Sequence, residues 1–321
     1  MPDVRSLLPA PARGIHRDFL RLPPPVIVIG MHRSGTSLVA GMLSLLGVYM
    51  DPALDLHPGT GADEIGLAMR ATGYGEAMAF RRVNESLLDV ADSRWDCVDG
   101  FLAQRDERLF AALSVLRLRL ATFGRLRAGF LTLRPDVPGG AWGFKDPRTS
   151  LTLPYWLRLF PQARVLHVRR DVDAVIASLI RRESSRGESA EGAVDWRPPL
   201  TRRLARKALN PAAALRYAAR RAGLGSAPCW RACPPQTFDD WMRLCGQYLR
   251  ECVAWRSLGS QYLEVRYERI LDDPMDAAAR LADFARVKAT DRARRCAALL
   301  VDSRHAGGAG REPSPLLASR A

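Results

Sequence analysis

The stretch that decides the fold runs from Val26 to Ser37 and reads VIVIGMHRSGTS. Its first four residues are a continuous run of β-branched apolar residues between a proline run and Gly30, which is typical of a strand buried on both faces of a parallel sheet. From Thr36 onward the apolar residues recur at helical spacing, and Gly47 is placed to end that helix. A strand, a glycine-bounded loop and a helix therefore follow one another directly.

The loop of this unit, GMHRSGTS from Gly30 to Ser37, has the GxxxxG spacing of a phosphate-binding loop. Backbone N–H groups and the positive end of the helix dipole converge on an anion at such a position. In nucleotide triphosphatases the residue after the second glycine is a lysine. Here that residue is Thr36, and the cation stands earlier in the loop, at Arg33. The loop therefore predicts an anion site that differs from an ordinary ATP or GTP site.

A second strand–helix unit follows later in the chain. Residues 164–168 predict another buried strand, and apolar residues from Val172 to Ile180 recur at i, i+3, i+4, i+7 and i+8, which indicates an amphipathic helix. Arg170 follows the strand and supplies a forked cation, while Ser178 supplies a hydroxyl two turns along the helix. Strands that alternate with helices predict an α/β fold with a three-layer, doubly wound, mostly parallel sheet.

The other expected elements are short strands and amphipathic helices. Residues 76–130 are mostly helical in pattern, and residues 142–144 predict a short strand followed by a helix to about residue 160. Further on we expect a helix over 238–255, a strand over 262–265 and a helix over 274–284 opened by proline. One leucine-rich stripe is expected in the first helical region, at Leu109, Leu113, Leu116, Leu120 and Phe123.

The domain organisation follows from the composition along the chain. Residues 1–24 are rich in Pro and Arg and predict a flexible N-terminal segment, and residues 304–321 predict a mobile tail. Residues 25–303 predict a single domain, because strands and helices recur throughout. A segment at about 184–235 breaks the pattern with Arg, Pro, Gly and Ala, and we interpret it as a basic insertion or lid.

The charge indicates an anionic partner. The chain has 321 residues, a net charge of +14 and 47% hydrophobic residues, which excludes a wholly disordered or an acidic protein. Among the 48 basic residues only Lys145, Lys207 and Lys288 are lysines. Residues 181–231 alone carry 12 basic and 4 acidic side chains. Nucleic acid, an anionic membrane and phosphorylated or sulfated small molecules are the partners that such a charge attracts.

Other classes are disfavoured by the sequence. The six cysteines show no paired CxxC spacing and fit no standard zinc pattern, so we expect neither a disulfide scaffold nor a metal site. No run of 18 apolar residues occurs, and the N-terminal region lacks the apolar core of a signal peptide. We therefore expect a cytoplasmic protein.

Four segments resemble one known family. The stretch VIVIGMHRSGTSLVAGMLSLLGV is similar to the 5′-phosphosulfate-binding loop of sulfotransferases that use 3′-phosphoadenosine 5′-phosphosulfate, or PAPS. Arg170 with Ser178 eight residues later resembles the 3′-phosphate-binding motif of that family. Residues 145–148, KDPR, resemble a segment of bacterial and tyrosylprotein sulfotransferases, and residues 262–271 resemble the late strand with its Tyr-Glu pair. The resemblance spans about residues 25–286.

The resemblance implies an enzyme with a P-loop NTPase-like sulfotransferase fold that takes PAPS as its donor. A metal is less needed than in phosphoryl transfer, because a sulfuryl group carries less negative charge and fixed dipoles and cations can serve instead. Arg33 and Lys145 are the expected catalytic cations, although Lys145 paired with Asp146 is an alternative. The expected donor-binding residues are Arg33, Ser34, Gly35, Thr36, Ser37, Arg170, Ser178 and Tyr267.

The expected general base is Glu76, because Gly73-Tyr74-Gly75-Glu76 matches a Gly-Tyr-x-Glu pattern found in similar bacterial proteins. His57 is the alternative base. We interpret His32 and His167 as packing or cofactor-adjacent residues. Near the C-terminus, Arg304 and His305 are candidates to close over the nucleotide.

The acceptor is expected to be a hydroxyl group of a carbohydrate, a glycolipid or another alcohol. Residues 181–231 are candidates for docking to an anionic membrane surface, which would make the protein peripheral there. Two other functions stay open: a P-loop kinase or nucleotide-binding protein, and a basic nucleic-acid- or membrane-binding protein. Nucleic acid is not the expected partner, because only Trp196, Tyr217 and Trp230 supply aromatic rings in the basic segment. The sequence does not indicate an oligomeric state.

Overall fold

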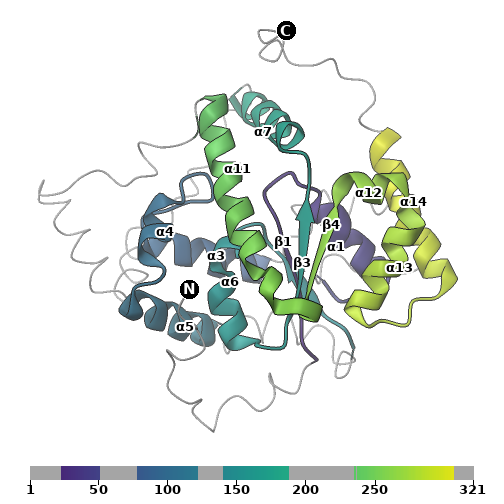
Figure 1. Ribbon diagram of the computed structural model, residues 1–321, viewed down its shortest axis with the longest axis horizontal. Helices are drawn as coiled ribbons and strands as arrows, with labels where there is room; N and C mark the ends of the chain where they lie inside the picture. Colours follow the sequence, from purple (N-terminus) through teal and green to yellow (C-terminus); the bar gives the residue numbers. More distant parts are fainter. Residues whose placement is uncertain (1–22, 51–77, 122–139, 188–234, 236, 307–321) are drawn as a thin grey trace, which may run out of the picture.

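A four-stranded sheet lies at the centre of the molecule (Figure 1). The computed structural model describes residues 23–50, 78–121, 140–187, 235 and 237–306 of the chain. All neighbouring strands in this sheet pair in parallel, in the order β2-β1-β3-β4. The predicted parallel α/β fold is therefore confirmed. The strands are β1 (Val26–Ile29), β2 (Gly143–Lys145), β3 (Arg164–Arg169) and β4 (Tyr262–Arg266).

One face of the sheet is covered by helices from the beginning and the end of the chain. Val28 of β1 and Leu166 and Val168 of β3 point to this face and pack in one apolar core with these helices. Helix α1 is buried on nearly every side, because it lies between the sheet and the two C-terminal helices. The elements on this side are α1 (Thr36–Leu45), α12 (Tyr267–Asp272), α13 (Pro274–Ala285) and α14 (Asp291–Ala306).

The opposite face is covered by the helices from the middle of the chain (Figure 1). Ile27, Ile29 and Val165, which alternate with the residues of the first face, belong to this second core. The three layers predicted from the sequence are thus present. The elements on this side are α3 (Met78–Val90), α4 (Asp99–Gln104), α5 (Arg108–Ala121), α6 (Thr149–Leu159), α7 (Val172–Gly187), α11 (Phe238–Val253) and the 3₁₀ segment η4 (Ala254–Gln261).

The pairing of β1 with β3 decides where a ligand can lie. Ile29, the last residue of β1, is in register with His167 near the end of β3. The loops that follow the two strands therefore leave the sheet at the same edge. Helix α1 then packs on one face and α7 on the other. Such a switch point at the carboxyl ends of parallel strands is where α/β sheets bind ligands.

The leucine stripe predicted for the first helical region is not the face of α5 that packs. Leu109, Leu116 and Leu120 are exposed, with Leu109 at 58%. The helix instead buries a face formed by Phe110, Ala111, Ser114, Val115 and Leu118. Helix α5 has apolar residues on two faces, and the face with Phe110 is buried because that ring packs edge-on against Phe101. Phe123 lies outside the described residues.

Two predicted boundaries fall inside helices. Residues 184–187, the expected start of the basic insertion, continue α7, and residues 304–306, the expected start of the tail, continue α14. The rest of the insertion apart from residue 235, the rest of the tail, and residues 1–22 lie outside the described residues. No helix in the described ranges is long and apolar enough to cross a membrane.

A glycine allows β2 to lie against β1. A β-carbon at Gly143 would come within 2.2 Å of the carbonyl oxygen of Val26 and 3.1 Å of the sulfur of Met50. Both contacts are with well-packed neighbours, and the first is with backbone. The glycine of α11, Gly246, differs, because a β-carbon there would meet only the end of the Arg250 side chain, at 3.8 Å.

We therefore expect Gly143→Ala and Gly246→Ala to change stability in opposite directions. Gly143→Ala should lower the free energy of unfolding by about 1–3 kcal/mol, because the sheet must shift to admit the methyl group. Gly246→Ala should raise it by about 0.5–1 kcal/mol, because alanine loses less backbone entropy in a helix. Urea denaturation of the two variants measures both changes, and equal stability of the two would contradict the packing described for β2.

Candidate active site

The loop between β1 and α1 presents unpaired backbone donors at the carboxyl edge of the sheet. Gly35 is the N-cap residue of α1 and has a left-handed backbone, with φ 96° and ψ 5°. No side chain caps this helix start, and its first turn contains no acidic residue. The first N–H groups of a helix have no partner within the helix, and they carry its positive dipole end. The loop is therefore suited to bind an anion.

Both glycines of the loop are required by close contacts, one with a strand and one with a helix. Gly30 has φ 144°, and a β-carbon there would lie 2.5 Å from the carbonyl oxygen of Val168 in β3. At Gly35 a β-carbon would lie 2.2 Å from the ring of Tyr267, the first residue of α12. The two glycines of the GxxxxG spacing thus allow β3 and the Tyr267 ring to approach the loop closely, and they also allow the chain to turn. The ring of Tyr267 packs against the loop as a result.

The two predicted motifs meet at this edge. The Nε of Arg33 donates a hydrogen bond to Oγ of Ser178 at 2.9 Å, and a guanidinium N–H of Arg170 donates to the carbonyl oxygen of Arg33 at 3.2 Å. The guanidinium of Arg170 also lies 4.6 Å from the centre of the Tyr267 ring. The structure therefore brings together five of the expected donor-binding residues, which are Arg33, Gly35, Arg170, Ser178 and Tyr267.

Two polar atoms of the loop are buried without a partner. Oγ of Ser34, a side chain only 2% exposed, and Nε2 of His32, at 6%, have no hydrogen-bond partner within the described part of the chain. A buried polar atom that lacks a partner costs about 1–3 kcal/mol. Unpaired atoms of this kind in a native structure indicate a ligand or water that completes them.

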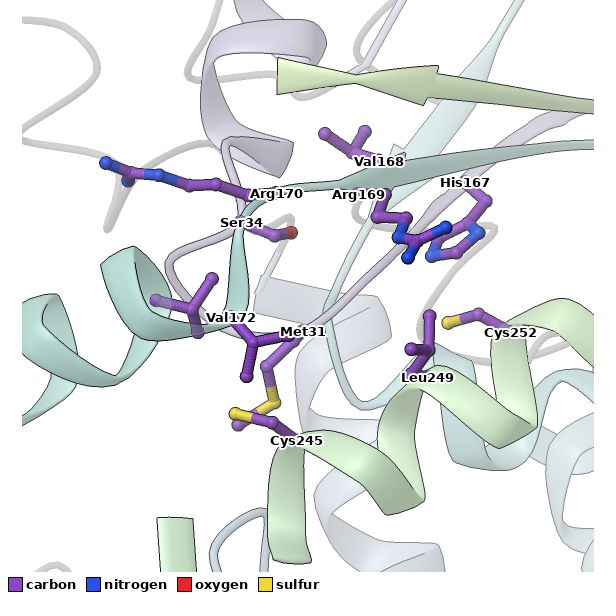
Figure 2. A pocket seen from close by; sticks show the side chains of 11 residues that line it. Met31, Ser34, His167, Val168, Arg169, Arg170, Val172, Cys245, Leu249 and Cys252 are labelled. Atoms are coloured by element: carbon purple, nitrogen blue, oxygen red, sulfur yellow. The ribbon is translucent and has the colours of Figure 1, made fainter. Parts of the chain in front are cut away.

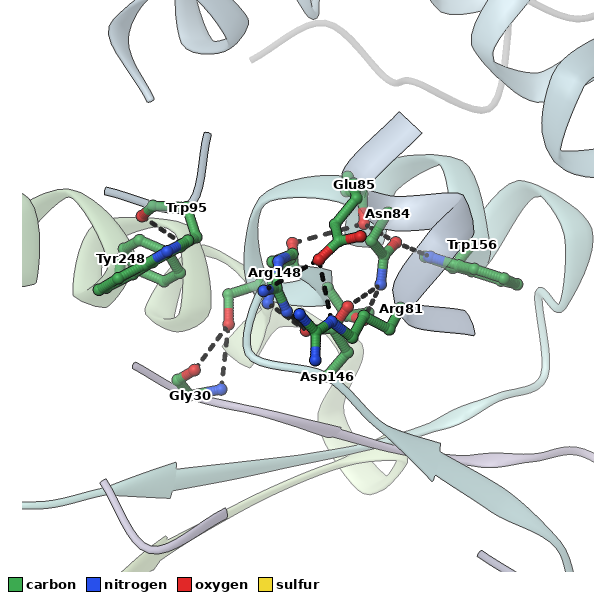
Figure 3. Close-up of polar contacts among 12 residues, drawn as sticks. Gly30, Arg81, Asn84, Glu85, Trp95, Asp146, Arg148, Trp156 and Tyr248 are labelled. Carbon is green, nitrogen blue, oxygen red and sulfur yellow. Dashed lines mark hydrogen bonds and ion pairs between the residues drawn. The ribbon is translucent and has the colours of Figure 1, made fainter. Parts of the chain in front are cut away.

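The segment Lys145-Asp146-Pro147-Arg148 lies beside the loop on β2 and at the start of α6. Lys145 is 1% exposed and pairs in register with Val28 of β1. A carboxylate oxygen of Asp146 accepts hydrogen bonds from the backbone N–H of Arg148 at 3.1 Å and from its guanidinium at 2.8 Å. The guanidinium of Arg148 also forms an ion pair with Glu85 of α3 at 3.4 Å. Figure 3 shows Asp146 and Glu85 on opposite sides of Arg148.

Asn84 of α3 holds this segment in place (Figure 3). Its amide nitrogen donates to Asp146 at 2.9 Å and to Thr149 at 2.8 Å. Its amide oxygen accepts from Thr152 at 2.7 Å and from the indole N–H of Trp156 at 2.9 Å. Asn84 is fully buried, and both polar atoms of its amide are satisfied.

Ser150, the second residue of α6, joins this helix to the loop. The N–H of Gly30 donates to Oγ of Ser150 at 3.0 Å, and this hydroxyl also contacts the carbonyl oxygen of Gly30 at 3.3 Å. Helix α6 is in turn fixed to α3 through Asn84. The end of β1 is therefore bonded directly to α6, and through α6 it is linked to α3.

The Sulfotransferase family profile matches residues 24–213, more than half of the chain, and includes the loop, the KDPR segment and the Arg170–Ser178 unit. The chain belongs to the sulfotransferase family. A search of curated proteins gave no match. The expected transferase class is confirmed at this level.

Similar solved structures are all distant from this sulfotransferase. The sulfotransferase domain of the olefin synthase of Synechococcus PCC 7002 is 16% identical, with 93% of this chain and 87% of that chain covered and a TM-score of 0.43. Sulfotransferase STF1 from Mycobacterium tuberculosis H37Rv is 14% identical, with coverages of 91% and 80% and a TM-score of 0.47. Sulfotransferase STF9 from Mycobacterium avium is 15% identical, with coverages of 92% and 72% and a TM-score of 0.41.

The sulfotransferase has a small cavity on the α11 side of the loop (Figure 2). Figure 2 shows Met31 of the loop beside Cys245 of α11, with His167 and Arg169 of β3 farther along the cavity. The ring of His167 contacts the hydroxyl of Tyr262 at 2.7 Å. Burial lowers the pKa of His167 to about 4, so its imidazole is neutral at pH 7. His167 lines the cavity wall together with Arg169 and Arg170, and its interpretation as a packing or cofactor-adjacent residue stays a prediction.

Several predicted site residues are not placed by the structure. Glu76 and His57, the two expected bases, lie outside the described residues. Arg304 and His305 belong to α14, but their side chains lie outside the described part. Within the described ranges, no group of three or more His, Cys, Asp and Glu residues is arranged to hold a metal ion.

The sequence analysis missed the residues that support the site. Thr149 and Ser150 follow directly after the KDPR motif, so a pair of hydroxyl residues next to a matched segment was a signal for Ser150. Asn84 stands among apolar and charged residues in α3, where only its burial shows its role. Nothing in the sequence indicated that Trp95 lies beside the loop, with its ring centre 4.5 Å from that of His32.

We expect substitutions of Asn84 to separate its acceptor role from its donor role. Asn84→Ala should lower the free energy of unfolding by about 3 kcal/mol, because it leaves several buried groups unpaired. Asn84→Asp keeps an oxygen that accepts the hydrogen bonds from Thr152 and Trp156, but it places a second carboxylate beside Asp146. Burial and that like charge raise the pKa of the new carboxyl group above its unfolded value, so its destabilising effect should be largest at high pH and decrease as the pH falls.

Urea denaturation of wild type, Asn84→Ala and Asn84→Asp at about pH 5 and about pH 8 tests this, since the pKa of an ordinary aspartate lies below both values. The difference between wild type and Asn84→Asp should be smaller at the lower pH. A difference in unfolding free energy that is the same at both pH values would contradict the close contact between position 84 and Asp146.

Proposed function

We propose that this sulfotransferase transfers a sulfuryl group from PAPS to a hydroxyl group of a carbohydrate, a glycolipid or another alcohol. The observation that carries the proposal is the meeting of Arg33, Arg170 and Ser178 beside the uncapped start of α1. A bisphosphorylated nucleotide needs two anion sites within the length of one nucleoside. The loop supplies one of them, and the Arg170–Ser178 unit supplies the other.

The residues at this edge fit such a donor. Oγ of Ser34 is buried and unpaired, and the first-turn N–H groups of α1 at Thr36 and Ser37 have no side-chain cap. Hydroxyl and backbone N–H groups of this kind bind phosphate or sulfate oxygens. In our proposal Arg33, Ser34, Gly35, Thr36 and Ser37 bind the 5′-phosphosulfate group. Arg170 and Ser178 bind the 3′-phosphate, and Tyr267 lies beside the adenine.

PAPS supplies the sulfuryl group and a phosphate leaving group. The protein has to stabilise the negative charge that develops on the bridging oxygen of that leaving group, and fixed cations in a site with little water do this well. We assign this role to Lys145 and Arg33. Lys145 is buried on β2 beside the loop, and Arg33 already bridges the loop and α7 through its bond to Ser178. A metal ion is not part of the proposal.

Transfer to the acceptor requires a general base. The base must come within hydrogen-bond distance of the acceptor hydroxyl. Glu76 is the base that the sequence pattern proposes, with His57 as its alternative.

The proposal also includes the domain organisation expected from the sequence, with a single domain over residues 25–303 and a basic insertion at 184–235.

We expect donor binding to depend on the Arg170–Ser178 unit. Arg170→Ala should weaken binding of adenosine 3′,5′-bisphosphate about 10- to 100-fold, and Ser178→Ala about 5-fold, because a charged hydrogen bond contributes more than a neutral one. Isothermal titration calorimetry with this nucleotide measures both values. Arg280→Ala, which removes an exposed arginine of α13, is the matched control and should bind as wild type does.

The same titration distinguishes the sulfotransferase from a kinase. Wild-type protein should bind adenosine 3′,5′-bisphosphate and be indifferent to ATP with Mg²⁺. Transfer of radiolabelled sulfate from PAPS should then be measured with 4-nitrophenol, octyl glucoside and N-acetylglucosamine, with Arg33→Ala as an inactive control. Preference for ATP with Mg²⁺, or full turnover by Arg33→Ala, would contradict the proposed function.

We also propose that residues 181–231 dock on an anionic membrane surface, which would bring a glycolipid acceptor to the site. The charge of this segment supports the proposal, because lysine and arginine clusters bind anionic lipids electrostatically. Protein should sediment with vesicles that contain phosphatidylserine and lose this binding in high salt. Replacing Arg202, Arg203 and Arg206 by glutamine should weaken binding several-fold. Unchanged sedimentation of that variant would contradict the proposal.

A further inference from the structure

We propose that His32, in place of Glu76 or His57, serves as the general base that takes the proton from the acceptor hydroxyl. The inference rests on the proposed sulfuryl transfer. It is carried by the position of His32 within the loop, by the unpaired Nε2 atom of its ring, and by the aromatic and cationic side chains that surround it.

His32 and Arg33 are neighbours in the loop but face different parts of the structure. The Arg33 side chain reaches Ser178 of α7. The ring of His32 lies 4.5 Å from Trp95 and 6.3 Å from Tyr248 of α11, measured between ring centres. The hydroxyl of Tyr248 donates to the backbone carbonyl oxygen of Trp95 at 2.9 Å, which joins α11 to the segment that carries Trp95 (Figure 3). The ring of His32 therefore packs against two aromatic residues that are linked to each other.

The unpaired Nε2 of His32 requires a partner. Oriented imidazole rings in proteins usually have both nitrogens satisfied, and leaving one buried and unpaired costs about 1–3 kcal/mol. Trp95 is only partly buried and covers one side of the ring. A hydroxyl group that enters beside Trp95 would supply the missing partner. The same position borders the loop that we assign to the 5′-phosphosulfate.

Burial and nearby cations keep the ring of His32 neutral. Burial, and then the nearby cations Arg148, Arg182 and Lys145, hold the pKa of His32 well below 6.5. A neutral ring has the free lone pair that a base needs at pH 7. The cations that act on the ring are Arg81 of α3, Lys145 and Arg148 of the KDPR segment, and Arg182 of α7. Tyr248 of α11 packs near the ring. The acidic groups nearby act on these neighbours: Glu85 and Asp146 pair with Arg148, and Asp96 acts on Tyr248.

A bound donor changes this balance in the direction that favours catalysis. The negative charges of the phosphosulfate group offset the cations that disfavour a protonated imidazole, so the pKa of His32 rises when the donor is present. The base therefore becomes stronger only in the complex that can react. In free protein the same cations keep the ring from taking a proton from water.

The step balances with groups that the reaction already supplies. The acceptor O–H transfers its proton to Nε2 of His32, and the acceptor oxygen forms the new bond to sulfur. The bond between sulfur and the bridging oxygen breaks, and its electron pair leaves with adenosine 3′,5′-bisphosphate. The proton on His32 is then released to solvent. No oxidant, reductant or metal ion takes part.

The other histidine whose side chain the structure describes is engaged through one nitrogen. His167 is buried at the cavity wall, and its Nδ1 lies 2.7 Å from the hydroxyl of Tyr262 and 3.5 Å from Glu264. Two residues of β4 therefore orient its ring. In His32, by contrast, Nε2 is buried and lacks a partner in the described residues.

The decisive variant is His32→Gln, tested with acceptors of different acidity. Glutamine retains an amide N–H near the position of Nε2 but cannot take a proton. Release of adenosine 3′,5′-bisphosphate from PAPS should fall about 100-fold with water or octyl glucoside as the acceptor, because positioned general bases contribute on this order. With 4-nitrophenol, which is already largely ionised at mildly alkaline pH, the rate should fall less than about tenfold.

A second measurement reads the histidine directly. In ¹⁵N-histidine-labelled protein, the imidazole signal that disappears in His32→Gln should titrate well below the ordinary range in free protein. Its midpoint should rise when adenosine 3′,5′-bisphosphate is added. Calorimetry with this nucleotide shows whether the variant is folded and binds, and its affinity should remain within a few-fold of wild type.

The outcomes separate the inference from the proposed function. If wild type neither binds adenosine 3′,5′-bisphosphate nor turns over PAPS, the proposed function is wrong. If wild type is active and His32→Gln retains its rate with water and octyl glucoside, or loses the same factor with every acceptor, His32 is not the base. In that case Glu76→Gln, measured in parallel, should show the acceptor-dependent loss instead.

Discussion

The parallel pairing of β1 with β3 is the constraint on which the site depends. Because Ile29 and His167 are in register, the loops after both strands leave the sheet at one level. Gly30 can follow Ile29 there only without a side chain, since a β-carbon would collide with the carbonyl oxygen of Val168. The hydrogen bonds from Arg33 to Ser178 and from Arg170 to the loop carbonyl then join the two strand–helix units. A shift in this register would separate the β1–α1 loop from the Arg170–Ser178 unit.

The positive charge of the chain lies partly in one basic segment and partly in single side chains at fixed positions. Much of it lies in residues 181–231, where composition alone suggests attraction to an anionic surface. A few cations instead occupy fixed positions at the sheet edge, each held by a hydrogen bond or an ion pair. Arg148 shows the difference, because its guanidinium lies between Asp146 and Glu85. Burial lowers the pKa of His32 most, and the positive charge of Arg148 lowers it further.

Local sequence patterns predicted most of the fold. The apolar run at β1, the glycine bracket and the helical spacing of α1 lie within 20 residues, so their structure depends mainly on neighbours in sequence. The stripe on α5 was a poorer guide, because that helix carries two apolar faces and only contacts with Phe101 and its neighbours decide which is buried. The helix boundaries at α7 and α14 extended beyond the predicted ones, since composition changes gradually there.

The sequence by itself determined the sulfotransferase loop, the Arg170–Ser178 unit and their placement after two strands, because each motif is short and its spacing is set by one strand–turn–helix. Only the tertiary structure decided what surrounds them. Asn84, Trp95 and Tyr248 come from segments far apart in the chain, and packing of α3 and α11 against the sheet brings them to the loop. The neutral, unpaired ring of His32 results from that burial and from cations on separate elements, and no local pattern records either one.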